Sequence, residues 1–236
     1  MPNYNKNELL NNAKEFFDEF FENRVDRLKK KKESSFKSNP FLIRSLAMAF
    51  SSNITAKTKA KALVYPFALG TSINTSFGEN IQNFIIETVP NAFGSTTSGM
   101  DIEFIDQLDG NKKYCQIKSG PQTINKADIK SIEDDFKNAV NLARINRVTM
   151  ATNDLVLGVV YGTHDDLNNM YKTIESHGYN VLVGSEFWEH LTGFSDFYNE
   201  LIKIAQNSAR KVKMDNAIKE LIARTEDYIK KNPSLF

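Results

Sequence analysis

Two short, continuous apolar runs limit what this chain can fold into. Residues 154–162 read DLVLGVVYG, and residues 180–185 read NVLVGS. Runs of this length, rich in Val and Leu, are typical of strands buried on both faces of a sheet. A predicted helix over 165–177 separates them. The pattern therefore indicates a sheet whose central strands are covered by helices.

A tight turn joins two further predicted strands upstream of these runs. Residues 101–106 (DIEFID) and 113–118 (KYCQIK) flank the sequence LDGN, in which Asp109-Gly110 is a strong hairpin signal. Helices are expected over 74–87, over 126–147 and through the tail from residue 186 to about residue 231. The order of elements predicts an α/β fold, a mixed central β-sheet flanked by helices.

The first 70 residues are expected to be helical. Residues 7–32 form a long amphipathic pattern with four Phe on its apolar stripe, and shorter helices are expected over 41–50 and 54–64. Such a stripe needs a partner surface, in the same chain or in a second copy, and both interpretations stay open. We therefore expect a helical region over 1–70, a candidate for dimerisation and, through its basic residues, for contacts with a phosphate backbone, and a core with C-terminal helices over 71–236.

The charge of the chain is segregated along the sequence. Its 30 basic and 29 acidic residues give a net charge of +1, yet residues 24–61 hold eleven basic residues and two acids, a net charge of +9. A block of this kind is either a solvated face or a phosphate-binding footprint, and charge alone does not decide between them.

Composition and termini exclude several classes. The chain is 41% hydrophobic and 25% charged, which excludes wholesale disorder. No run of about 18 apolar residues is present, so no membrane span is expected. The start MPNYNKNELL lacks a signal-peptide core, and the single Cys115 excludes an intrachain disulfide. We expect a cytoplasmic protein.

Polar side chains alternate along the predicted hairpin. Period-2 alternation puts Asp101 and Glu103 on one face of the first strand, and Gln116 and Lys118 on one face of the second. Antiparallel pairing brings the start of the first strand near the end of the second, so Asp101 approaches Lys118. A plain salt bridge is the simplest interpretation of that pair.

The pattern also resembles the PD-(D/E)xK nuclease superfamily, in SGMD at 98–101 and QIK at 116–118. The run QIKSGPQTIN at 116–125 is similar to a subset of type II restriction endonucleases, the group that cuts GGNCC-like interrupted palindromes. The resemblance covers about residues 74–162. Gln116 departs from it, because the superfamily pattern has an acid at this position.

The resemblance implies Mg²⁺-dependent hydrolysis of phosphodiester bonds at a short, specific double-stranded DNA site. Asp101 would anchor the metal beside the Gln116 side-chain oxygen and the Ile117 backbone carbonyl, and Glu79 would bind it directly or through water. Lys118 would orient the water or offset charge on the transition state. The implied catalytic residues are Asp101, Gln116, Lys118 and Glu79, and the implied metal ligands are Asp101, Gln116, Ile117 and Glu79.

The neutral Gln116 leaves three outcomes open. Either Glu79 or Glu103 compensates for the missing acid, or metal binding is weaker, or the protein is an inactive relative.

Polar residues after the predicted catalytic strand are candidate DNA contacts. Thr123 or Asn125 is expected to cap the helix that starts at Lys126, and a helix N-terminus beside the site suits a phosphate. Amide side chains also match adenine edges. The candidate DNA-binding residues are Ser119, Gln122, Thr123, Asn125 and Lys126.

The expected partners follow from the same resemblance. They are double-stranded DNA, a second copy of the chain that matches a palindromic site, and a cognate DNA methyltransferase, with no membrane. The alternatives are a junction resolvase-like repair or recombination nuclease, and a non-catalytic DNA-binding relative whose site decayed at Gln116. A helical interaction module with an incidental Asp101–Lys118 salt bridge is a further one.

Overall fold

The structure is a computed structural model that describes residues 5–37 and 39–236, without the side chains of residues 71 and 72. The chain separates into two compact units. The sheet unit contains the described part of Met1–Phe16 together with Gly78–Ala205, and the helical unit contains Phe17–Phe77 together with Gln206–Phe236.

The sheet unit is built on five strands. Their order in the sheet is the order in the chain: β1 (Ala92–Gly94), β2 (Ile102–Ile105), β3 (Lys112–Lys118), β4 (Leu155–Val159) and β5 (Asn180–Val183). The first three strands are antiparallel, and β4 and β5 run parallel to β3. The expected mixed sheet is confirmed. Its two apolar runs form β4, which is buried along its whole length, and β5. The expectation that both are central strands is wrong for β5, which lies at the edge of the sheet and pairs with β4.

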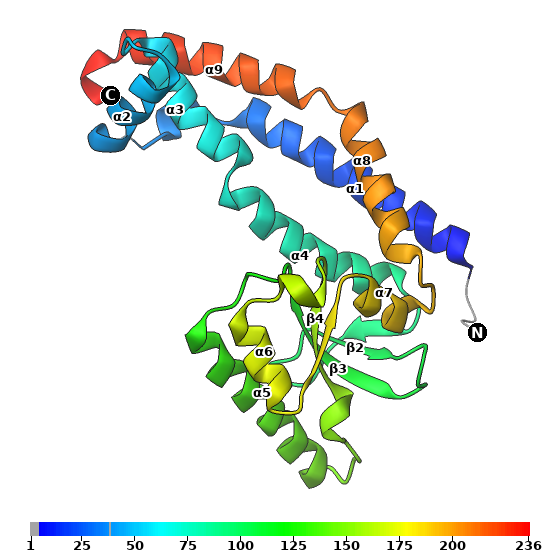
Figure 1. Ribbon diagram of the computed structural model, residues 1–236. Coiled ribbons are helices and arrows are strands. Elements are labelled where there is room, and N and C mark those ends of the chain that lie inside the picture. The colour runs from blue at the N-terminus through cyan, green and yellow to red at the C-terminus, as the bar shows by residue number, and fades with distance from the viewer. Residues whose placement is uncertain (1–4, 38) are drawn as a thin grey trace. The chain divides into compact units, whose positions relative to one another are not determined.

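Helices cover both faces of this sheet (Figure 1). Helices α5 (Lys126–Ile145) and α6 (Asn169–Ser176) share one apolar core with the face that carries Tyr114, Leu157 and Val181. On the other face, α7 (Ser185–Thr192) packs closely against β4. A Cβ added at Gly158 would lie 2.5 Å from the Phe187 ring and 2.9 Å from Cys115 Sγ, so a glycine is needed there.

The predicted hairpin is present and is extended by a strand that the sequence did not indicate. Asp106 N donates to Asn111 O across the turn at 2.9 Å. The unpredicted strand β1 is three residues long and ends at Gly94, and it pairs with β2 through Ala92↔Phe104. A segment this short carries no periodicity, so only its pairing with β2 defines it.

The helical unit has its own apolar core. Helices α3 (Ala56–Leu69) and α9 (Met214–Lys231) pack together, so the end of the chain joins its N-terminal part. The other helices that contribute residues to this unit are α1 (Lys6–Lys30), α2 (Pro40–Phe50), α4 (Thr71–Thr88) and α8 (Phe197–Lys211). Short 3₁₀ helices span Glu33–Ser35 here and Pro233–Leu235 at the end, and Thr152–Asp154 and His164–Asp166 in the sheet unit.

The Phe stripe of α1 finds partners within the chain. In the sheet unit, Phe16 lies 5.0 Å from Phe84 between ring centroids. In the helical unit, Phe17 and Phe20 lie 6.5 Å and 5.9 Å from the Phe77 ring. Of the two interpretations that the stripe allows, packing within one chain accounts for these contacts.

Within the part of the chain that the structure describes, no helix is both long enough and apolar enough to cross a membrane.

Candidate active site

A cleft of about 330 Å³ in the sheet unit gathers the residues of the predicted motif. Asp101 reaches it from the turn before β2, Gln116 and Lys118 from the end of β3, and further polar residues from α5. The residues that line it are Gly99, Met100, Asp101, Gln116, Lys118, Asp128, Ser131, Ile132 and Asp135.

Backbone contacts position the Asp101 carboxylate. The sequence placed Asp101 at the start of a strand, and β2 begins one residue later, but Asp101 N still donates to Cys115 O at 2.9 Å. Its Oδ2 accepts a hydrogen bond of 2.6 Å from Ile117 N. One carboxylate oxygen is thereby held against the β3 backbone, next to the residue whose carbonyl was expected to bind a metal.

The register puts the two polar sets on the same face of the sheet, which alternation along each strand had left open. Glu103 pairs with Tyr114, and Ile102 with Cys115, so the residue before Ile102 lies across from Gln116. Lys118 is the last residue of β3, and its side chain lines the same cleft as Asp101. The pairing thus brings Asp101, Gln116 and Lys118 together from positions up to 17 residues apart.

Gln116 is 5% exposed, and its amide nitrogen is committed to two acceptors. Nε2 donates to Gly99 O at 2.6 Å and to Asp135 Oδ2 at 2.9 Å. An amide has one nitrogen and one oxygen. Because Nε2 is bound to these two acceptors, Oε1 is the amide atom that does not contact them.

The donor set of the cleft consists of oxygen atoms. Among residues 5–37 and 39–236, no group of three His, Cys, Asp or Glu side chains is arranged to hold a metal ion. A metal at Asp101 would therefore draw on the Gln116 amide oxygen, the Ile117 carbonyl and water. Mg²⁺ fits such a set, because it binds one or two carboxylates and keeps several waters.

Glu103 lies on the expected face but serves the hairpin. It is 6% exposed, and it forms a 2.6 Å ion pair with Lys112 and hydrogen bonds with Ser95 and Thr97 at 2.8 Å and 3.2 Å. Burial raises the pKa of the Glu103 carboxyl, but hydrogen bonds from Lys112, Ser95 and Thr97 outweigh it, so the pKa is lowered overall. Glu103 is not among the residues that line the cleft.

Glu79 lies on α4 and is exposed. The residue before it, Gly78, faces the end of β3, since a Cβ there would lie 3.4 Å from Ser119 Cβ. The structure thus puts Glu79 one residue from a contact with the segment that follows Lys118. It does not include Glu79 among the residues lining the cleft, and a metal-binding role for Glu79 stays a prediction.

Three polar residues of the cleft were missed by the sequence analysis. Asp128, Ser131 and Asp135 all lie on α5, at spacings of three and four residues that put them on one side of the helix. Asp128 Oδ2 accepts from Asn125 N at 2.7 Å and so also caps the helix. The helical period, read outward from the buried Ile132 and Phe136, was the signal that could have identified them.

The candidate DNA contacts surround the start of α5. Asn125 caps the helix, with Oδ1 accepting from Ala127 N at 2.8 Å. Thr123 Oγ1 donates to Gly120 O at 2.8 Å, and Gln122 Nε2 donates to Asp166 O. Lys126 is exposed at the first turn. These contacts show a structural role for Asn125, Thr123 and Gln122, and DNA binding by the set stays a prediction.

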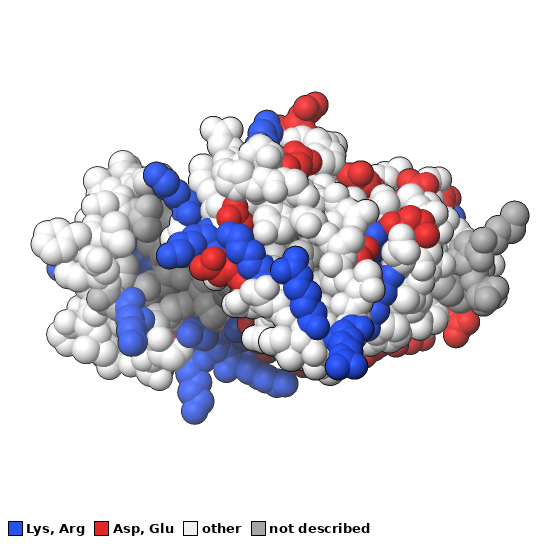
Figure 2. All heavy atoms as spheres, turned by 90° about the horizontal axis from the view of Figure 1, so that it is seen from below, with Lys and Arg blue, Asp and Glu red and all other residues white. Residues whose placement is uncertain are grey.

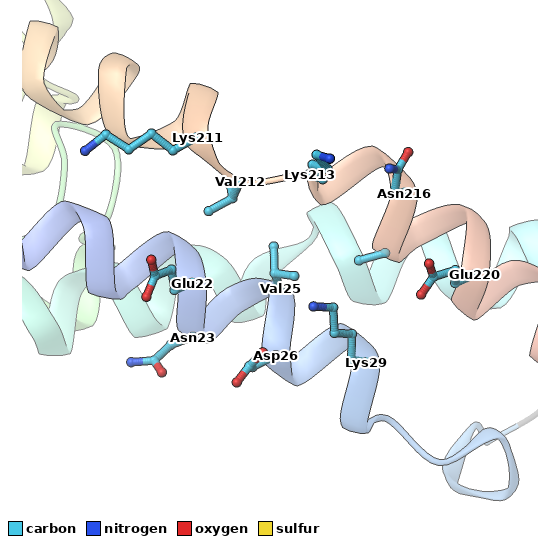
Figure 3. A pocket seen from close by; sticks show the side chains of 11 residues that line it. Glu22, Asn23, Val25, Asp26, Lys29, Lys211, Val212, Lys213, Asn216 and Glu220 are labelled. Carbon is cyan, nitrogen blue, oxygen red and sulfur yellow. The ribbon is translucent and has the colours of Figure 1, made fainter.

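A larger hollow, of about 520 Å³, lies in the helical unit (Figure 3). Its charged side chains are of both signs: Glu22, Asp26 and Glu220 line it together with Lys29, Lys211 and Lys213. None of the motif residues lies in it. The chemistry of the side chains, rather than volume, therefore selects the smaller cleft as the candidate active site.

Comparison with known families gives a match to this chain. The sequence model of the family described as type II restriction endonuclease EcoO109I matches residues 7–213 of the 236. No curated protein matches the chain. The family match spans both units and includes every residue that lines the cleft. The chain belongs to the type II restriction endonuclease EcoO109I family.

Proposed function

We propose that this restriction endonuclease uses Mg²⁺ to hydrolyse phosphodiester bonds at a short, specific site in double-stranded DNA. The observation that carries the proposal is the convergence of Asp101, Gln116 and Lys118 on one cleft, in a chain of a restriction endonuclease family. A bound Mg²⁺ supplies the positive charge that offsets the phosphate and lowers the pKa of water.

The residues of the cleft divide the remaining work. One oxygen of the Asp101 carboxylate accepts a hydrogen bond from Ile117 N. The proposed ligands of Mg²⁺ are the other Asp101 oxygen, the Ile117 carbonyl oxygen and the Gln116 amide oxygen. The Lys118 ammonium group orients the attacking water and stabilises negative charge as it builds on the phosphate oxygens. Hydrolysis adds water across one P–O bond and leaves a phosphate monoester and a hydroxyl group. Glu79 is proposed to bind the metal directly or through a water molecule.

DNA binding is proposed for the segment after β3 and for basic side chains. The N-terminus of α5, with Lys126 in its first turn, suits a phosphate. Ser119, Gln122, Thr123 and Asn125 precede it on the same stretch. Figure 2 shows Lys and Arg side chains projecting from the surface in this view. We propose that exposed basic side chains of this kind contact the DNA phosphates.

A homodimer is proposed, because two copies related by a two-fold axis match a palindromic site. The helical unit offers a surface for it on α2, where Phe41 is 84% and Leu42 58% exposed. Exposed apolar patches of this kind mark interaction sites. Light scattering should give a dimer for the wild type and a monomer for Phe41→Ser with Leu42→Ser, whereas an unchanged mass would exclude this surface. The proposed cellular partner is a DNA methyltransferase that protects the same site.

Digestion of plasmid DNA tests the proposal. With Mg²⁺ the protein should give discrete fragments, and with EDTA it should give none. Nicking confined to branched junctions would favour a resolvase instead. Binding without cleavage at any Mg²⁺ concentration would show a decayed site, and the absence of both would exclude the proposed function.

A further inference from the structure

The acid position of the motif is occupied by an amide that has an acid as its neighbour. Gln116 Nε2 lies 2.9 Å from Asp135 Oδ2 and 2.6 Å from Gly99 O. Both neighbours are hydrogen-bond acceptors, so only the nitrogen of the amide can face them. The orientation of Gln116 is therefore set by its partners.

Gly99 shows that the approach of Asp135 is built into the fold. Its φ of +82° is one that residues with side chains rarely adopt, and a Cβ there would lie 2.5 Å from Asp135 Cγ. The space that a side chain would fill is taken by the Asp135 carboxylate. Gly99, Gln116 and Asp135 thus form one packed cluster that comes from the loop before β2, from β3 and from α5.

Asp135 differs from the other acids near the cleft in its hydrogen-bond partner. Asp128 Oδ2 accepts from Asn125 N in the cap of α5, and Glu103 is paired with Lys112 at 2.6 Å. Asp135 is the cleft acid whose hydrogen bond to Gln116 links it to β3.

We propose that Gln116 and Asp135 act as one unit in place of the acid of the motif. Asp135 is a positioning residue: it holds the Gln116 amide so that Oε1 is presented beside Asp101, and it supplies the negative charge that Gln116 lacks. The charges of Asp101, Asp135 and Lys118 then sum to the value that Asp101, Lys118 and a glutamate at position 116 would give. The inference rests on the proposed metal-dependent function and assigns a role to a residue outside the motif.

Asp135 should be needed for metal binding and cleavage only while residue 116 is an amide. An amide has one oxygen and must be held the right way round, whereas a carboxylate has two equivalent oxygens and its own charge. Replacing Gln116 with Glu should therefore remove the need for Asp135. Interacting sites of this kind deviate from independent, multiplicative effects in a double-mutant cycle.

The experiment compares Asp135→Ala in two backgrounds, the wild type and Gln116→Glu. Two quantities are measured for each protein: the Mg²⁺ concentration that gives half-maximal cleavage, and the dissociation constant for Mn²⁺ by calorimetry without turnover. In the wild type, Asp135→Ala should raise both by about 10- to 100-fold, as losing a partner of a metal ligand commonly does. In the Gln116→Glu background the same change should raise neither quantity, because Asp135 is no longer needed and its carboxylate would face the Glu carboxylate that replaces the Gln116 amide.

The neighbouring acid on α5 provides a matched control. Asp134 is exposed and does not line the cleft, so Asp134→Ala removes the same charge from the same helix and should leave both quantities unchanged. Melting followed by circular dichroism checks that each variant is folded.

Equal effects of Asp135→Ala in both backgrounds, or no effect in the wild type, would overturn the inference. A wild-type protein that does not cut DNA would instead overturn the proposed function, and the Mn²⁺ dissociation constants would still test the pair. A wild type that binds no Mn²⁺ would overturn the inference as well.

Discussion

Single side chains of the sheet unit are held by contacts that the sequence does not reveal. Alternation put Asp101 on one face of its strand and Gln116 with Lys118 on one face of the next, and the strand register showed that these faces coincide. Alternation did not distinguish Glu103, which is bound to Lys112, from an acid of the cleft. It also did not identify Asp135, since a hydrogen bond between β3 and α5 depends on how that helix packs. Sequence patterns predicted positions on a strand, and tertiary packing decided the partners.

His190 predicts a pH dependence of stability. Its Nδ1 lies 2.7 Å from Oδ2 of Asp106, which is 1% exposed, and this hydrogen bond raises the pKa of His190 above its usual 6.5, although burial opposes the shift. A raised pKa in the folded state stabilises the fold fully below pH 6.5 and loses that contribution as the pH rises through the folded-state value.

The measurement is the free energy of unfolding in urea for the wild type and for His190→Gln, which keeps a neutral donor. The wild type should lose stability relative to the variant as the pH rises from about 5.5 to about 8.5. A difference that stays constant with pH would contradict the assignment to His190.

Among the helices and strands, the long segments with clear hydrophobic periodicity were predicted well, and the shortest strand was not predicted. The predicted helices over 7–32 and 126–147 appear as α1 and α5 with ends shifted by two residues or fewer. The strand β1, three residues long, had no pattern to find. The helical tail was predicted, but its packing against α3 was not, because amphipathicity shows that a helix has a partner and not which one.

Close packing between α7 and β4 predicts a cost for a single methyl group. Gly158→Ala should destabilise the protein by about 1–3 kcal/mol, because the new Cβ overlaps the Phe187 ring and Cys115 Sγ. Gly94→Ala is the matched control, since its nearest neighbour, Ile86 Cδ1, would be 3.7 Å away. Unfolding in urea measures both variants, and equal stabilities would show that α7 shifts freely.

For the whole molecule, the net charge of +1 conceals a basic block over 24–61. Some basic residues of the block over 24–61 make contacts within the fold. Arg24 is 3% exposed and donates to Phe67 O and Ala68 O at 2.8 Å and 2.7 Å, and Lys31 lies over the Phe36 ring at 4.9 Å. The count of +9 therefore overstates the charge that phosphates can reach.

The exposed lysines of the block are the ones to test. Changing Lys29, Lys30 and Lys32 to Gln, with Lys31 kept because of its ring contacts, should make the plot of log affinity against log salt less steep. The slope should fall by about one for each phosphate that the variant no longer neutralises. Lys219→Gln on α9 is a matched control, because Lys219 lies outside the block and pairs with Asp215 at 2.5 Å. An unchanged slope in the triple variant would make these lysines a solvated face.

Cleavage of DNA in the cleft that holds Asp101 and Lys118 is the activity on which the other proposals depend. Single-turnover cleavage of a plasmid that the wild type cuts is the most direct test, with DNA binding measured separately by gel shift in EDTA. Asp101→Ala should abolish cleavage, and Lys118→Ala should slow it by about 100- to 1,000-fold, because each loses charge stabilisation at the phosphate. Both variants should still bind DNA. Cleavage by either variant at the wild-type rate would contradict the account.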